Sequence, residues 1–322
     1  MISRVAQSCF WLHRYMERAE ATARLLQVTQ HVSLDVELPE AALWQPVLEV
    51  SGEARRYGEA YGDTLESEAV QAFLTWDEAN PVSLLASLHR ARENARTIRE
   101  TISLETWQSL NSLWLWLASR DARRLYQRER HAFYERVKAG CQLYHGLYHT
   151  TMLFDEPYDF MRLGSLMERA DQTIRILRAT WRAVEGRRKR EDHPTDGARW
   201  LAALRACTGV EAFAKRSRGT LVGPVVADFL LHDDRFPRAV LHCLLRAELF
   251  LDRARGGEGS EAGEASRALL SALVARLRGE SIETLVARGL PAELELLLAA
   301  HAELGAALHH DFFDLPVLPA GA

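Results

Sequence analysis

The feature that most restricts the fold is a twelve-residue segment that occurs twice. The first copy, Tyr15 to Leu26, reads YMERAEATARLL, and the second, Leu166 to Leu177, reads LMERADQTIRIL. Within each copy apolar residues recur at intervals of three and four, which is the spacing of one face of an α-helix. The chain must therefore fold so that two amphipathic helices of the same design each bury the same face.

The apolar face continues beyond the repeated segment in both places. In the first place it consists of Val5, Cys9, Leu12, Met16, Ala19, Ala23 and Leu26, and in the second of Phe160, Leu163, Met167, Ala170, Ile174 and Leu177. The small Ala19 and Ala170 predict that a neighbouring helix approaches each face closely.

Further matches recur at a nearly constant separation along the chain. Glu17 and Glu168 are 151 positions apart, whereas Trp44 and Trp200, like Pro81 and Pro237, are 156 positions apart. Such a period indicates an internal duplication, with repeats at about 1–150 and 151–322. No segment combines alternating apolar residues with β-branched enrichment, so we expect an all-α fold. The prediction is one helical bundle domain, residues 1–322, whose two duplicated halves are related by a pseudo-twofold axis.

Proline and polar segments predict where helices begin and where linkers lie. Asn80-Pro81 and Phe236-Pro237 are expected to start helices, since proline is tolerated in a first turn. Their apolar faces would be Leu84, Leu88, Ala91, Ala95, Ile98 and Ile102, and Val240, Leu244, Ala247, Leu251 and Ala254. Linkers are expected at 186–197 and 255–266, which are polar and poor in large apolar groups.

Composition excludes several classes of protein. The 322 residues carry a net charge of -4, which argues against bulk binding to nucleic acid or to an anionic membrane. No uncharged run reaches the length of a membrane span, and the charged amino terminus does not resemble a signal peptide. The four cysteines lack CxxC spacing, so we expect buried, reduced thiols in a cytoplasmic protein. P-loop, GxGxxG and GxSxG motifs are absent from the sequence, which argues against a self-sufficient kinase, dehydrogenase or serine hydrolase. We expect no bound cofactor.

Charged residues beside the apolar face also match between the two copies. One flank carries an acid, an acid and an arginine at i, i+3 and i+7, and the other carries an arginine and a threonine. The residues of the first copy are Glu17, Glu20, Arg24, Arg18 and Thr22, and those of the second are Glu168, Asp171, Arg175, Arg169 and Thr173. Two interpretations stay open, a structural network linking the halves and a ligand-binding site. If the flanks meet, the glutamates would lie close together, and one pKa would rise enough for acid/base work.

A second set of charged residues differs between the halves. Arg92, Arg96 and Arg99 form a basic stripe, whereas the corresponding positions are Glu248, Asp252 and Arg255. Pairing between the stripes is the favoured interpretation, and an anion site on the first half alone, with Glu93 and Asn94 nearby, is the alternative.

Histidines give weaker signals. His145 and His149 are spaced to share a metal ion on one helix, but the aromatic sequence LYHGLYH favours a packing face. His309-His310-Asp311 lies near the carboxyl end. We predict no metal site.

Four ordered segments resemble one family. They are ISRVAQSCFWLHRYMERAEATARLL at the amino terminus, ARENARTIRETIS at 91–103, FMRLGSLMERADQTIRIL at 160–177 and DFLLHDDRFPRAVLHCLLRAE at 228–248. Together they resemble the bacterial alpha-E domain family, and the resemblance covers essentially the whole chain.

The resemblance implies an all-helical protein that works beside, or fused to, a circularly permuted ATP-grasp ligase, with transglutaminase-like or proteasome-like peptidases as further companions. It also implies a role in making a small peptide or modifying a protein. The positions that match the family's polar motifs are Glu17, Arg18, Arg24, Glu168, Arg169, Arg175, Arg92, Glu93, Asn94, Arg96 and Arg238. Ala239 departs from the pattern, because a serine commonly follows the Pro-Arg of this motif.

Three functional hypotheses follow. The leading one is a helical partner of the ligase that binds an amino acid or peptide, with the arginines holding carboxylates and with Glu17 and Glu168 as the catalytic candidates that receive ammonium groups or protons. The second is an enzyme in its own right, a small-group transferase or amide hydrolase with a glutamate base. The third is a structural adaptor whose glutamates tie the halves together.

Overall fold

The computed structural model describes residues 3–62, 64–185, 195–217, 221–256 and 262–314. Over these residues the chain forms sixteen α-helices and no strand, as the all-α prediction requires. The helices are α1 (Ser3–Asp35), α2 (Glu40–Ser51), α3 (Ala54–Tyr61), α4 (Ser67–Trp76), α5 (Leu84–Thr97), α6 (Leu104–Leu117), α7 (Arg120–Arg128), α8 (Arg130–Thr151), α9 (Glu156–Glu185), α10 (Thr195–Ala206), α11 (Val210–Ser217), α12 (Gly223–His232), α13 (Val240–Ala254), α14 (Glu264–Gly279), α15 (Ile282–Arg288) and α16 (Leu290–Phe312).

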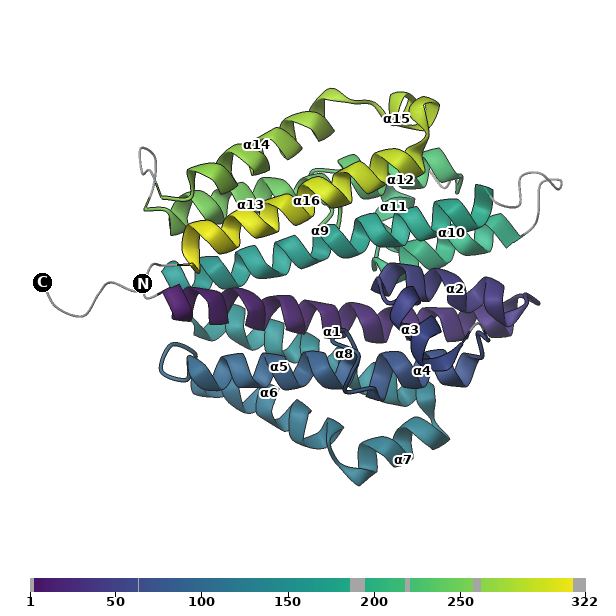
Figure 1. Cartoon of the computed structure of the whole chain (residues 1–322), viewed down its shortest axis with the longest axis horizontal. Coiled ribbons are helices and arrows are strands. Elements are labelled where there is room, and N and C mark those ends of the chain that lie inside the picture. Colours follow the sequence, from purple (N-terminus) through teal and green to yellow (C-terminus); the bar gives the residue numbers. More distant parts are fainter. Residues whose placement is uncertain (1–2, 63, 186–194, 218–220, 257–261, 315–322) are drawn as a thin grey trace, which may run out of the picture.

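The two helices that carry the repeated segment form the centre of the molecule. α1 and α9, with 33 and 30 residues, are the longest helices described and lie side by side (Figure 1). Apart from the half-buried Val5, every residue of the two predicted apolar faces is buried, including Ala19 and Ala170 at 0% exposure. The backbones come especially close at Gly164, where a Cβ would lie 2.2 Å from the carbonyl oxygen of Phe10.

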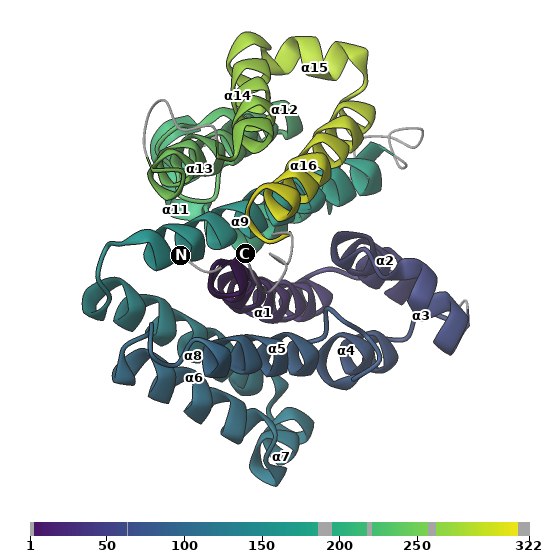
Figure 2. The ribbon, with the colours of Figure 1, turned by 60° about the vertical axis from the view of Figure 1, so that its left-hand side comes forward.

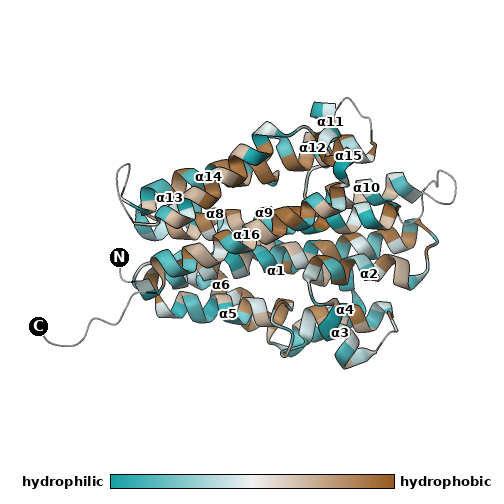
Figure 3. Ribbon diagram, turned by 45° about the horizontal axis from the view of Figure 1, so that its top comes forward, coloured by the Kyte–Doolittle hydropathy of each residue, from teal (hydrophilic) through white to brown (hydrophobic). Residues whose placement is uncertain are grey.

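The remaining helices pack on the two sides of this central pair. α5 and α8 pack against α1, and α13 and α16 pack against α9, which gives the two lobes seen in Figure 2. α6 and α7 extend the first lobe along α8, and α14 and α15 extend the second along α16. α2 and α10 each pack on both central helices, α1 and α9. Figure 3 shows polar and apolar residues mixed along each helix, as expected for amphipathic helices around a shared core.

Two helices start later than their prolines predicted. α5 begins at Leu84, and the Ser83 hydroxyl caps it by accepting from the Ala86 N–H at 3.1 Å. Pro81 lies in a turn instead, because the Asn80 side chain accepts from the Val82 N–H and donates to the Phe73 carbonyl. α13 likewise begins at Val240. The predicted starts at Pro81 and Pro237 were wrong by three residues, although both predicted apolar faces are buried.

The predicted linkers lie partly outside the described residues. Residues 186–194 and 257–261 are not described, whereas 195–197 belong to α10 and 264–266 to α14. The start of α1 is tied to the residue after α16, because the Ser3 hydroxyl donates to the Phe313 carbonyl at 2.6 Å. All four cysteines are free and buried, as expected. Among the helices described, none has an apolar stretch of the length that crossing a bilayer requires.

Candidate functional site

The charged flanks of the repeated segments meet at the interface between α1 and α9, where they pair reciprocally. Arg169 Nε lies 2.9 Å from Glu17 Oε2, and Arg18 Nε lies 2.6 Å from Glu168 Oε1. Both glutamates are completely buried. The arginine that follows each glutamate therefore neutralises the glutamate of the opposite helix, and two separate polar clusters result.

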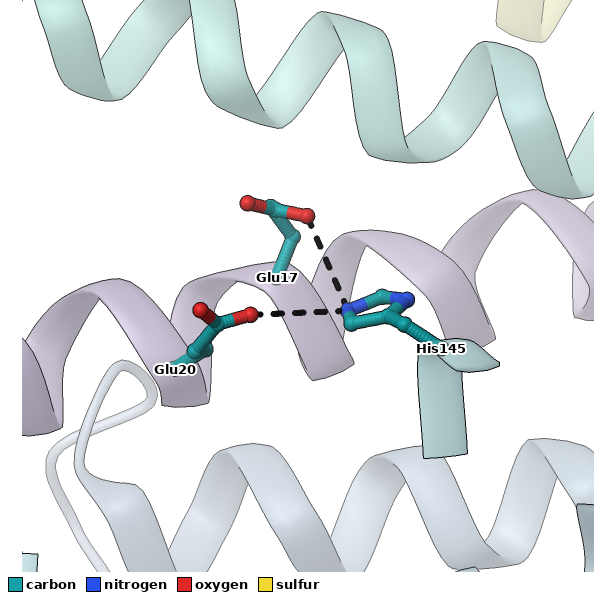
Figure 4. Close-up of side chains that lie close together, drawn as sticks. All are labelled: Glu17, Glu20 and His145. Carbon is teal, nitrogen blue, oxygen red and sulfur yellow. Dashed lines mark ion pairs between the residues drawn. The ribbon is translucent and has the colours of Figure 1, made fainter. Parts of the chain in front are cut away.

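The first cluster surrounds Glu17. Arg238 Nη1 lies 2.8 Å from Glu17 Oε1, and Arg238 Nη2 lies 3.4 Å from Glu20 Oε1. Arg24 also forms an ion pair with Glu20. The imidazole of His145 completes the group, with Nε2 at 3.7 Å from Glu17 Oε2 and 3.8 Å from Glu20 Oε2 (Figure 4). We refer to this group as the Glu17 cluster, which consists of Glu17, Glu20 and Arg24 of α1, His145 of α8, Arg169 of α9 and Arg238 from the loop before α13.

The carboxylates of the Glu17 cluster are ionised and its histidine is neutral. Burial opposes ionisation of Glu17, but the charges of Arg169 and Arg238 outweigh it and hold the pKa well below its usual range. The pKa of Glu20 is also lowered, because Arg238 and Arg24 overcome burial and the repulsion of Glu17. Burial lowers the pKa of His145 despite the two nearby carboxylates, so the imidazole is uncharged at neutral pH.

The second cluster surrounds Glu168. Arg18 holds this carboxylate with two nitrogens, Nε at 2.6 Å and Nη2 at 2.9 Å, and Arg14 Nε lies 2.8 Å away. Asp171 pairs with Arg175 Nε at 2.7 Å and lies 3.9 Å from His301 Nδ1. We refer to this group as the Glu168 cluster, which consists of Arg14 and Arg18 of α1, Glu168, Asp171 and Arg175 of α9, and His301 of α16.

Neither candidate glutamate is poised for proton transfer near neutral pH. Burial alone would raise the pKa of Glu168, but Arg18 and Arg14 lower it to about 2. A general base works best with a pKa near the working pH. The expectation that close glutamates would raise each other's pKa is wrong, because each carboxylate lies between guanidinium groups instead.

A polar pocket of about 240 Å³ borders the Glu168 cluster. Arg18, Asp171 and Arg175 contribute charged groups to its wall, and Glu53 faces them from the turn after α2. Arg175 lies over Gly52, whose positive φ of 76° ends α2, and a Cβ there would lie 3.1 Å from Arg175 Nη1. The full lining is Arg18, Thr22, Leu25, Val50, Ser51, Gly52, Glu53, Leu74, Val82, Glu168, Asp171, Gln172 and Arg175. Charges of both signs thus face one small cavity.

The Arg92 stripe belongs to neither cluster. Arg92 donates to Asn111 at 2.8 Å and pairs with Glu93 at 2.9 Å, while Arg96 pairs with the same Glu93 at 2.6 Å. Asn94 donates to the Arg90 carbonyl one turn earlier. The favoured prediction, pairing between the two charged stripes, is wrong.

The corresponding residues of the second half, Glu248 and Asp252, also find their partners within their own lobe. Glu248 accepts from Ser271, and Asp252 pairs with Arg267 and Arg255. Arg92 and Arg96 are therefore neutralised within α5, whereas Asp252 of α13 pairs with Arg255 and Arg267. The charge reversal between the two stripes does not reflect mutual contact.

Sequence reasoning missed three members of the clusters, Arg14, His145 and His301. His145 was considered only together with His149, whose Nδ1 instead lies 2.8 Å from the Tyr158 hydroxyl. Two signals could have found them. His145 and His301 are 156 positions apart, the same separation as Trp44 and Trp200, and Arg14 precedes Arg18 by one helical turn.

One set of ligand atoms could hold a cation. Glu17, Glu20 and His145 place one ligand atom each within 4.8 Å of one another. Carboxylate and imidazole groups suit zinc and other divalent transition metals. The three arginines of the same cluster oppose such an ion, because they carry charge of the same sign.

Comparison with known proteins agrees with the all-helical architecture. Residues 1–313 match the model of the Alpha-E family, described as a predicted alpha-helical domain with a conserved ER motif. The chain therefore belongs to the Alpha-E family.

Relatives in mycobacteria carry no assigned function. An uncharacterised protein of Mycobacterium bovis is 29% identical over 94% of this chain, and two uncharacterised proteins of Mycobacterium tuberculosis match equally well. The chain spans 35% of the length of these curated relatives. No solved structure matches the chain.

Proposed function

We propose that this Alpha-E protein is the helical partner of a circularly permuted ATP-grasp amide ligase and that it binds an amino acid or peptide for ligation. The observation that carries the proposal is the pocket beside the Glu168 cluster. Arg175 presents a guanidinium to this cavity, and Asp171 and Glu53 present carboxylates. The two ends of an amino acid are a carboxylate and an ammonium group, which require partners of these opposite charges.

The chemistry of the pocket residues supports this ligand class. Arg175 uses Nε for Asp171, which leaves its terminal nitrogens directed toward Gly52 and the cavity. The arginine side chain is 29% exposed and Asp171 is 14% exposed, so both can be reached from solvent. An arginine held by a carboxylate through Nε is restrained in orientation, which suits it to bind a second carboxylate through Nη.

The lengths of the relatives support a partnership. In the mycobacterial proteins the region that matches this chain is 35% of the polypeptide, so it is there covalently joined to further sequence. The family resemblance names an ATP-grasp ligase as the companion. ATP-dependent ligation would take place in the cytoplasm, and transglutaminase-like or proteasome-like peptidases would then process the product.

A structural role is the second candidate, and one observation favours it. The reciprocal pairs between α1 and α9 join the two lobes through buried ions, as the adaptor hypothesis requires. Catalysis by an isolated glutamate is less well supported, because the pKa of Glu168 is lowered to about 2 and that of Glu17 is also lowered.

We also propose that the architecture arose by internal duplication and that the Glu-Arg pairs at 17–18 and 168–169 are equivalent. The order of elements supports this view, since α2 and α10 begin 155 positions apart, and α4 and α12, like α5 and α13, begin 156 apart. His145 lies close to Glu20 and His301 lies close to Asp171, which occupy matching positions of the repeated segment. The two histidines are also 156 positions apart in sequence. A pseudo-twofold axis between α1 and α9 would exchange the clusters.

The test is reconstitution with the ATP-grasp ligase encoded nearest to this chain. ATP consumption and product mass are measured over a panel of amino acids with wild-type protein, Arg175→Met and Arg182→Met. Arg182 is a matched control, because it lies on the same helix but pairs at the surface with Glu295. We expect a new product only when the helical protein is present, and an increase of about tenfold or more in the amino-acid KM for Arg175→Met alone. Equal product formation by the ligase alone would contradict the proposal.

A further inference from the structure

The Glu17 cluster carries an uncompensated positive charge. Its two ionised carboxylates, Glu17 and Glu20, lie among three guanidinium groups. His145 is neutral at pH 7, because burial lowers its pKa. The cluster as defined therefore holds three positive and two negative charges in a site from which water is largely excluded.

Arg24 has two buried nitrogens that lack a hydrogen-bond partner among the described residues. Its side chain is 3% exposed and pairs with Glu20 through Nη2. The two buried nitrogens are Nε and Nη1. Buried guanidinium N–H groups normally find an acceptor, since leaving a charged donor unpaired is costly. The position of Arg24 thus indicates a missing acceptor.

The carboxylate of Glu17 does not supply that acceptor. Arg169 and Arg238 lie within 2.9 Å of its oxygens. These contacts are ion pairs, and neither oxygen of Glu17 has a hydrogen-bond partner among the described residues. The polar groups of the cluster are therefore gathered at ion-pair distance but incompletely hydrogen bonded.

A divalent cation would add to the net positive charge of the Glu17 cluster. Glu17, Glu20 and His145 have suitable ligand atoms within 4.8 Å. Adding two positive charges would, however, raise the excess from one to three in a buried group, where uncompensated charge is strongly disfavoured. One negative charge would instead bring the balance to zero.

We propose that the Glu17 cluster binds one small singly charged anion of the carboxylate class, with Arg24 as its principal donor. The anion supplies the acceptor that Arg24 lacks and balances the three arginines. The cluster reaches the surface at His145, Arg169 and Arg238, whose side chains are 15%, 17% and 12% exposed. This site is separate from the pocket at Arg175 and does not depend on the proposed ligase partnership.

The experiment is a titration of the isolated full chain with carbon-13 formate, followed by NMR line width at constant ionic strength. Because Arg175 is itself proposed to hold a carboxylate, the comparison is made between Arg175→Met and the double variant that also carries Arg24→Met, with the wild type as reference. We expect saturable binding in Arg175→Met that weakens at least tenfold in the double variant. Competition with chloride and with phosphate separates a carboxylate site from a general anion site, and displacement by both as effective as by unlabelled formate would overturn the carboxylate assignment.

Two further measurements keep the test decisive if Arg24→Met does not fold. Arg24→Lys retains the charge while removing Nε and Nη1, and we expect it to fold and to bind formate at least tenfold more weakly than wild type. A formate-soaked crystal of the wild type should show a bound carboxylate beside Arg24. Formate binding unaffected by Arg24→Lys, absence of that bound carboxylate, or manganese binding that His145→Gln abolishes would each overturn the proposal.

Discussion

Replacing Glu168 by glutamine should destabilise the protein strongly. The carboxylate is fully buried, and Arg14 and Arg18 lower its pKa from 4.5 to about 2, which corresponds to roughly 3 kcal/mol of stabilisation at neutral pH. Glutamine also leaves two guanidinium groups without their counterion, and breaking a buried pair in this way typically costs about 3–5 kcal/mol. We therefore expect the free energy of unfolding, measured by urea denaturation at pH 7, to fall by about 3–5 kcal/mol.

The same substitution at Glu295 is a matched control. Glu295 also contacts two arginines, Arg178 and Arg182 at 2.6 and 2.9 Å, but its side chain is 44% exposed. Exposed pairs contribute about 0–1 kcal/mol, so Glu295→Gln should have a small effect. Comparable losses for the two variants would refute the view that burial gives the Glu168 pairs their strength.

The pH dependence checks the same reasoning. Because the pKa of Glu168 is lowered on folding, its stabilisation is complete above the unfolded pKa of 4.5 and is lost as the pH falls toward about 2. The difference between wild type and Glu168→Gln should therefore shrink by roughly 1.4 kcal/mol between pH 7 and pH 3.5. A difference that does not change over this range would contradict the assigned pKa.

Three more outcomes are expected. Ala239→Ser should stabilise the protein by about 1 kcal/mol by capping α13, as Ser83 caps α5, and Ser83→Ala should cost a similar amount in urea denaturation. Gly164→Ala should lower the melting temperature by several degrees, because its Cβ would lie 2.2 Å from the Phe10 carbonyl, whereas Gly146→Ala, with nothing within 4 Å, should raise it slightly. The four buried cysteines, all with raised pKa values, should resist a thiol reagent at pH 8 until the protein is denatured, and rapid labelling of native protein would contradict their burial.

The central helices could be predicted because their signal is local. Apolar spacing in the segments around Met16 and Met167 identifies the buried face of each helix without knowledge of its neighbours. Helix starts were less predictable. Pro81 and Pro237 occupy turns, since side-chain capping at Ser83 and the bonding of Asn80 determine where α5 begins.

The clusters could be predicted only in part. The repeat identified Glu17, Glu168 and the arginines that follow them, but the crossed pairing depends on how α1 and α9 are aligned, which no local pattern specifies. His145 and His301 come from helices distant in sequence, so only the repeat period could have indicated them. Arg92 and Arg96 form a charged stripe in sequence, yet Glu93 on the same helix neutralises both.

The most direct test of the proposed ligand site is binding of amino acids to the isolated protein by titration calorimetry. We expect at least one amino acid or short peptide to bind at the pocket with a stoichiometry of one. Arg175→Met and Asp171→Asn should each weaken this binding about tenfold or more, and Arg182→Met should not. Amidation of the ligand carboxylate should weaken binding to wild type but not further to Arg175→Met. If no amino acid or dipeptide binds, or if binding is unchanged in Arg175→Met, the pocket beside the Glu168 cluster is not the ligand site and the reciprocal pairs serve to hold α1 and α9 together.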